Sequence, residues 1–257
     1  METIIGLTIP FLGTALGAAI VLLMRGGISE KTNSAMLGFA SGVMVAASFW
    51  SLLQPAFEQV GEGIGNTWPV LAGFAAGICF LLTLDTVIPH QHVDDKGPEG
   101  PRSRLPRSIK MILAVALHNI PEGMAVGVVF GGVLSGNTDL TLAGALALSI
   151  GMAIQNIPEG AIISVPLRNE GKSPLKAFTW GAASGLVEPI AALVTMFILQ
   201  DSSAAMPLLL AFAAGAMLYV VVEELIPSSQ AGRHSNIGTI GFALGFVLMM
   251  TLDVVIG

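Results

Sequence analysis

The chain is poor in charge and almost free of cysteine. Only 11% of its 257 residues are charged, whereas 53% are hydrophobic, and soluble domains carry about 25% charged residues. The mean hydropathy of +0.79 therefore excludes an ordinary soluble domain. The single Cys79 lies in an apolar run, which excludes a disulfide framework and a Cys-x-x-Cys metal motif. A net charge of −6 also makes nucleic acid an unsuitable partner.

Long apolar runs take the place of charge. A membrane-spanning helix needs about 20 mostly apolar residues, and breaks rich in Gly, Pro, Asn or charge separate eight such runs. The expected spans are 3–24, 33–54, 67–88, 108–132, 139–165, 175–199, 205–227 and 236–256. We therefore predict an all-α polytopic membrane protein with a single transmembrane domain over residues 1–257. The first run has no basic residue before it, which favours a retained helix over a cleaved signal peptide.

The basic residues predict the orientation of these helices. All eleven Lys and Arg residues lie in or beside the loops that follow the first, third, fifth and seventh helices. Because positively charged loops stay in the cytoplasm, both termini are expected outside. The longest such loop is a linker at about 90–107, whose mixed charges and three prolines argue against packed structure. The loops on the opposite face carry four acids, Glu58, Glu62, Asp139 and Asp201. Two explanations are equally good: these acids attract cations, or they only make the loops soluble.

One six-residue segment occurs twice within the apolar runs. The sequence His-Asn-Ile-Pro-Glu-Gly at 118–123 recurs as Gln-Asn-Ile-Pro-Glu-Gly at 155–160. A charge near the bilayer centre costs at least about 2.5–3.5 kcal/mol, so each intramembrane Glu indicates a function. Helical spacing places His118 and Glu122 on one face, and likewise Gln155 and Glu159. Each proline bends its helix and leaves a carbonyl without its helical donor, a device found at transporter ion sites.

Further acids fall within the other spans. They are Asp85, Glu188, Glu223, Glu224 and Asp253. No Lys or Arg lies deep enough within the predicted spans to neutralise these acids. A buried carboxylate without a partner takes up a proton or needs a cation. Bound metal, bound protons and water-filled pathways all remain open on this reasoning.

Several polar side chains fall at mid-depth in their helices. His118, Glu122 and Glu188 do so, as does Met44 in the second span. Imidazole nitrogen, carboxylate and amide oxygens and a thioether suit a borderline divalent metal such as zinc. Taken singly, Asn119 is equally well explained as a residue that hydrogen-bonds between helices, and a Met at the position of Met44 is more often a packing residue than a ligand.

The cytoplasmic ends of the third and seventh spans also carry acids. Asp85 precedes Pro89, and Glu223 and Glu224 precede Pro227. His90 and His92 follow directly after Pro89. This cluster could receive a metal leaving the membrane, although each residue alone is better explained as solvated than as a ligand.

The two Asn-x-Pro-Glu-Gly repeats resemble the signature of the ZIP (Zrt/Irt-like) family of divalent-metal transporters, and the run at 42–48 resembles its bacterial branch. The resemblance implies a 3+2+3 arrangement in which helices 1–3 and 6–8 form an inverted repeat around helices 4 and 5. It implies metal ligands at His118, Asn119, Glu122, Gln155, Asn156, Glu159 and Glu188, with Met44 by position. Related bacterial members have two adjacent metal positions. Asn156 stands where some of them have an acid, which predicts a weaker second position here.

From this resemblance we expect inward transport of Zn²⁺, with Fe²⁺, Mn²⁺ and Cd²⁺ as alternative substrates, across a bacterial cytoplasmic membrane. Helices 1–3 and 6–8 would rearrange around the site, and Asp85, Glu223 and Glu224 would guide release. The lipid bilayer is the expected environment, and the small-residue face at 181–185 would allow a homodimer. A proton-linked carrier of another solute is one rival. An intramembrane metalloenzyme is another, although the sequence has no His-Glu-x-x-His motif.

Overall fold

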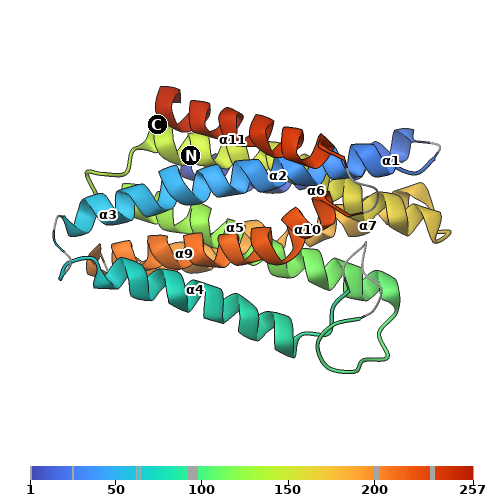
Figure 1. Cartoon of the computed structure of the whole chain (residues 1–257), viewed down its shortest axis with the longest axis horizontal. Coiled ribbons are helices and arrows are strands. Elements are labelled where there is room, and N and C mark those ends of the chain that lie inside the picture. Colours follow the sequence, from blue (N-terminus) through green and yellow to red (C-terminus); the bar gives the residue numbers. More distant parts are fainter. Residues whose placement is uncertain are drawn as a thin grey trace.

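The computed structural model describes residues 2–24, 26–61, 63, 65–91, 98–199, 203–231 and 235–256. It is a bundle of helices that run along the long axis of the molecule (Figure 1). Among the described residues, eight helical spans are long and apolar enough to cross a membrane, which confirms the predicted number. In this part of the chain the β structure is limited to one isolated bridge between His90 and Glu99.

Because apolarity fixes their length, the spans begin and end within four residues of the predicted limits, except that the second was predicted to end at 54 and continues to Val60. The elements are α1 (Glu2–Leu23), α2 (Glu30–Ala47), η1 (Ser48–Leu53), α3 (Gln54–Val60), α4 (Trp68–Val87), α5 (Arg107–Leu134), α6 (Leu142–Asn169), α7 (Pro174–Ser184), α8 (Val187–Leu199), η2 (Ser203–Ala205), α9 (Met206–Val220), η3 (Val221–Leu225), α10 (Ile226–Ser229) and α11 (Ile237–Ile256). Side chains of Ser29, Thr141 and Ser173 cap α2, α6 and α7, and each accepts the backbone N–H of the residue three positions on.

Three spans depart from a uniform α-helix. The second and seventh each contain a π-helical turn, η1 or η3, followed by a short helix with a proline, Pro55 or Pro227, in its first turn. These two spans are equivalent in the 3+2+3 arrangement, and π-turns occur frequently at functional sites. The sixth span breaks at Gly185 and Leu186. By contrast, α5 and α6 continue as helices through Pro121 and Pro158, where a bend was expected.

Close glycine contacts divide the spans into two groups. A Cβ added to Gly17 of α1 would lie 2.0 Å from the Ile157 oxygen of α6, and one added to Gly42 of α2 would lie 2.0 Å from the Phe242 oxygen of α11. Similar contacts join α5 to α8 and α4 to α9. These contacts connect α1, α5, α6, α7 and α8 with one another, and we call them the first group. They leave two separate pairs, α2 with α11 and α4 with α9, which we take together as the second group. Where a glycine of the first group meets a helix of the second, at Gly132 and Gly151, it faces the flexible side chains of Met206 and Met249.

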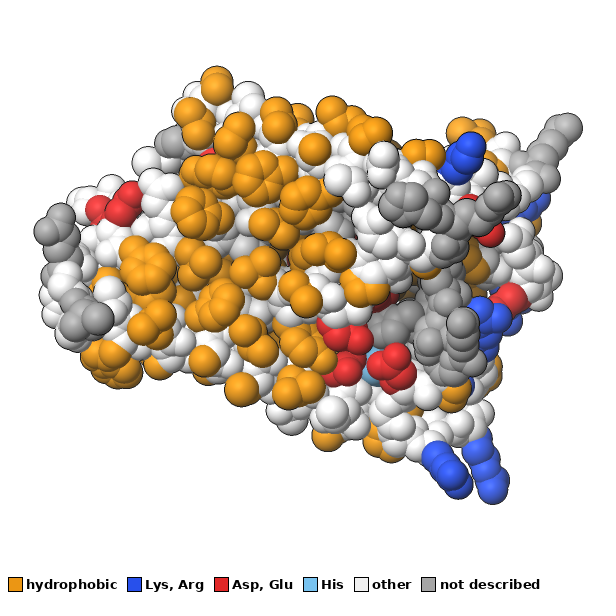
Figure 2. All heavy atoms as spheres, in the orientation of Figure 1, with side chains coloured by type: hydrophobic (Ala, Val, Ile, Leu, Met, Phe, Trp, Pro, Cys, Tyr) orange, Lys and Arg blue, Asp and Glu red, His pale blue; other side chains and the backbone are white. Residues whose placement is uncertain are grey.

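The surface is arranged as a membrane protein requires. Both termini lie at one end of the bundle (Figure 1). Figure 2 shows hydrophobic side chains over the middle of the visible face and Lys and Arg gathered at the end away from the termini. This distribution follows the charge asymmetry from which the orientation was predicted.

Candidate metal centre

The two repeats lie on α5 and α6, and their polar side chains point into the interior of the bundle. The eight predicted ligands are all buried: Met44, His118, Asn119, Glu122, Gln155, Asn156, Glu159 and Glu188. Among them Glu122, Gln155 and Asn156 have no exposed surface at all. The prediction that these polar groups face one another and not lipid is therefore consistent with their burial.

The Glu122 carboxylate faces the second repeat. The side chains of Gln155, Asn156 and Glu159 lie beside it. None of them meets it with hydrogen-bond geometry, since neither Glu122 oxygen has a hydrogen-bond partner among the described residues. The Glu159 carboxylate in turn lies within the electrostatic influence of Glu122, Glu188 and Glu224. Carboxylates gathered in a buried space repel one another unless a cation or protons join them.

Three further oxygens complete this set. Within the described part of the chain, Glu159 Oε2, Gln155 Oε1 and Asn119 Oδ1 are also buried without a hydrogen-bond partner. Buried acceptors are normally paired, because an unpaired one loses its hydration without replacement. Together with the two Glu122 oxygens, they make five acceptor atoms on two adjacent helices that need a positively charged partner. A divalent cation satisfies such a set in one step.

His118 makes a contact that crosses between the two groups of helices. Its Nε2 lies 2.6 Å from Oε2 of Glu224 on η3. Both side chains are mostly buried, with 10% and 14% of their surface exposed. Glu224 was predicted to act at the exit, and the structure places it beside the central histidine. The contact depends on η3, because the π-turn sets the direction in which Glu224 leaves the helix.

Glu188 belongs to a separate hydrogen-bond network. Its Oε1 accepts from Thr14 Oγ1 at 2.9 Å, and its Oε2 accepts from Asn156 Nδ2 at 2.8 Å. The Asn156 amide also reaches the Pro10 carbonyl oxygen at 3.3 Å. Thr14 was missed by the sequence reasoning. The first span contains three threonines, Thr3, Thr8 and Thr14, so a hydroxyl alone did not single out Thr14.

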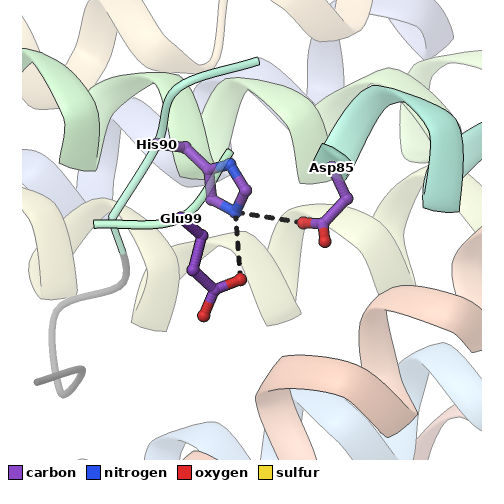
Figure 3. Close-up of side chains that lie close together, drawn as sticks. All are labelled: Asp85, His90 and Glu99. Carbon is purple, nitrogen blue, oxygen red and sulfur yellow. Dashed lines mark ion pairs between the residues drawn. The ribbon is translucent and has the colours of Figure 1, made fainter. Parts of the chain in front are cut away.

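A second cluster lies at the C-terminal end of α4 (Figure 3). His90 Nε2 lies 3.0 Å from Asp85 Oδ1 and 3.7 Å from Glu99 Oε2, so its ring points between two carboxylates. One ligand atom from each residue lies within 4.8 Å of the others. The Tyr219 hydroxyl donates to Asp85 Oδ2 at 3.3 Å. The side chains of Asp85, His90 and Glu99 therefore have the spacing and chemistry of a metal-binding group.

This cluster corrects two expectations. His90 is fully buried, where a solvated side chain was expected. The linker was expected to be unpacked, yet Glu99 N–H donates to the His90 oxygen at 2.9 Å and holds residues 98–100 against the end of α4. The sequence reasoning missed Glu99 because it treated the whole linker as unpacked. Of the other predicted exit residues, Glu223 is exposed on η3, and His92 lies outside the described residues.

A third acidic region lies at the opposite end of the bundle. Ser51 Oγ on η1 donates to both carboxylate oxygens of Asp253, at 2.8 and 3.0 Å. Both residues line a cavity of about 230 Å³, together with Glu58 and Asp139. Acids therefore occur at one end, in the middle and at the other end of the bundle.

Eight membrane-length helices around a buried set of carboxylate, amide and imidazole groups define the architecture of an ion-transporting membrane protein. The sequence profile described as "ZIP Zinc transporter" matches residues 89–253. The chain is 39% identical to zinc transporter ZIPB of Bordetella bronchiseptica, over 96% of this chain and 79% of that protein. It is 37% identical to zinc transporter GufA of Myxococcus xanthus, over 95% and 96%, and 34% identical to zinc transporter ZIP11 of Homo sapiens, over 95% and 94%. The chain belongs to the ZIP zinc transporter family.

Proposed function

We propose that this protein carries divalent transition-metal ions, Zn²⁺ first among them, inward across the cytoplasmic membrane. Fe²⁺, Mn²⁺ and Cd²⁺ are alternative substrates of the same ligand chemistry. The names of the relatives support zinc as the substrate. The observation that carries the proposal is the set of five buried acceptor oxygens that lack a hydrogen-bond partner within the described residues, on Asn119, Glu122, Gln155 and Glu159.

The ion would rest between α5 and α6. Glu122 and Glu159 would supply negative charge, Gln155 and Asn119 would supply amide oxygens, and His118 would select a transition metal over Ca²⁺ or Mg²⁺. Met44 would reach the ion from α2, in the second group of helices. The mixture of nitrogen and oxygen ligands is suited to Zn²⁺ because this ion accepts both.

The acidic regions at the two ends would extend this site into a pathway. Cations would gather at the cavity beside Asp253, pass to the central site and leave through Asp85, His90 and Glu99. Glu223 and Glu224 on η3 would line the last step. On this view the termini are extracytoplasmic, as the distribution of Lys and Arg also predicts.

Alternating access would come from movement between the two groups of helices. We expected the first three and last three spans to rearrange around α5 and α6. The glycine contacts support another division, because α1 and α8 pack on α6 and α5 too closely for those pairs to separate. The first group would carry the ion, and the second would open either end.

Uptake of radioactive Zn²⁺ into proteoliposomes tests the proposal. Glu122→Gln and Glu159→Gln keep side-chain volume but remove the charge. Each should lower uptake at low Zn²⁺ concentration at least about 100-fold, because even outer-shell partners of metal ligands contribute about 10- to 100-fold. Glu170→Gln, at an exposed position after α6, is the matched control. Normal uptake by both site variants would show that the assigned centre is wrong, and competition with other divalent ions would rank the substrates.

A further inference from the structure

The Glu188 carboxylate is fully engaged by neutral donors. Only 1% of Glu188 is exposed, and Thr14 and Asn156 beside it have no exposed surface. One oxygen accepts from the Thr14 hydroxyl and the other from the Asn156 amide nitrogen, at 2.9 and 2.8 Å. Its situation differs from that of Glu122, whose two oxygens lack hydrogen-bond partners in the described part of the chain. The two buried carboxylates therefore have different roles.

A carboxylate accepts hydrogen bonds and cannot donate them, which fixes the direction of the network. Asn156 must turn its NH₂ group toward Glu188, so its carbonyl oxygen points the other way. That oxygen accepts from the NH₂ group of Gln155. Gln155 is then left with its own carbonyl oxygen, Oε1, which is buried and has no hydrogen-bond partner among the residues described. Gln155 lies beside the Glu122 carboxylate.

We propose that Glu188, held by Thr14, is a positioning carboxylate that orients the Asn156 and Gln155 amides in series, so that the central site takes a single ion. This inference rests on the proposed function. The family resemblance implied that Glu188 is a metal ligand and that a second metal position is present. With an acid at 156, two carboxylates would face each other and require a cation between them. Asn156 donates to Glu188 instead and removes that requirement.

The number of ions bound per chain tests the inference. Purified protein is equilibrated with Zn²⁺ at low excess by dialysis, and bound metal is measured by mass spectrometry. All samples carry His90→Ala, so that ions held by the Asp85–His90–Glu99 cluster are not counted. We expect one ion per chain, none after Glu122→Gln, and one after Glu188→Gln. Asn156→Asp should raise the number to two, because it restores a second pair of facing carboxylates.

A second measurement tests the positioning role of Glu188 directly. In protein loaded with Co²⁺, Glu188→Gln should change the ligand-field absorption of the single bound ion, since Gln155 loses its fixed orientation. Thr14→Val should weaken Co²⁺ binding by about tenfold, the effect of losing one hydrogen bond to a charged group. Thr14→Ser, which keeps the hydroxyl, should restore it. A merely structural role of Thr14 would not distinguish Ser from Val in folded protein of equal thermal stability.

The outcomes separate this inference from the proposed function. Two ions in the His90→Ala protein, of which Glu188→Gln removes one, would overturn the single-ion assignment and leave metal transport intact. One ion in the Asn156→Asp variant would contradict the explanation from the neutral amide, and an unchanged Co²⁺ spectrum after Glu188→Gln would refute the positioning role. Protein that binds no ion at all would count against the proposed function itself.

Discussion

His118 Nε2 lies 2.6 Å from Glu224 Oε2, and this contact joins the two groups of helices at the level of the candidate metal centre. His118 is carried by α5 in the first group, and Glu224 by η3 in the C-terminal part of the seventh span. A nitrogen that binds Glu224 cannot bind a metal at the same time. In the proposed mechanism an ion at the central site would therefore compete with Glu224 for His118, and binding of the ion would release a link between the groups.

Removal of this competitor should tighten metal binding. We expect Glu224→Gln to lower the dissociation constant for Zn²⁺ by about tenfold, since a hydrogen bond to a charged group contributes about 1.5–3 kcal/mol. The maximal rate of uptake should fall, because the ion leaves His118 more slowly without Glu224 to take its place. Calorimetry and proteoliposome uptake measure the two effects, with Glu170→Gln as the control. Weaker binding in the Glu224 variant would identify Glu224 as a ligand of the ion and not its competitor.

Much of this fold could be predicted from sequence because its causes are local. The eight spans follow from apolar length, and the depth of Glu122 and Glu159 follows from their place within those runs. Helical periodicity gave the shared face of His118 and Glu122. The contacts between Thr14 and Glu188, and between His118 and Glu224, could not be obtained in this way. Each joins residues more than 100 positions apart, and helix order alone does not set which faces of the spans meet.

The π-turns and the linker were missed for a different reason. Pro55 and Pro227 are visible in the sequence, but a proline near a helix end fits a kink, a cap or a π-turn equally well. The linker has the composition of an unpacked segment. Glu99 packs nevertheless, because its backbone pairs with His90 and its carboxylate approaches the His90 ring. Composition averaged over a loop does not reveal one such anchored position.

The cluster of Asp85, His90 and Glu99 predicts a defect late in transport. Glu99→Gln removes one charged ligand from this group but leaves the central site unchanged. We expect the maximal uptake rate to fall by about threefold to tenfold with little change in KM, since a lost charged ligand weakens the interaction by about 1 kcal/mol or more. Zn²⁺ titration of uptake gives both constants. A change confined to KM would place Glu99 before the central site instead of after it.

The cavity beside Asp253 predicts a salt-dependent step at the other end. Asp253→Asn removes a charge from the lining of this cavity, which also contains Glu58 and Asp139, and which would attract cations from solution. The KM for Zn²⁺ should rise by about twofold to fivefold at low ionic strength, and the difference from the unchanged protein should disappear at high salt, because ions screen such fields beyond about 10 Å at 0.1 M. Measurement of KM at two salt concentrations separates this long-range effect from direct coordination, which would persist at both.

The contact between α1 and α6 predicts that Gly17 affects both stability and binding. A Cβ at this position would lie 2.0 Å from the Ile157 oxygen, which is backbone and cannot turn aside. Gly17→Ala should therefore push the two helices apart and cost about 1–3 kcal/mol, as overpacking does. Because Ile157 follows Asn156 in α6, the same displacement should move the Gln155 and Asn156 amides and weaken Zn²⁺ binding. Gly26→Ala, where an added Cβ meets no atom within 4 Å, is the matched control. Thermal unfolding in detergent, with and without Zn²⁺, measures both effects, and an unfolding temperature for Gly17→Ala equal to that of the control would contradict the close packing of α1 on α6.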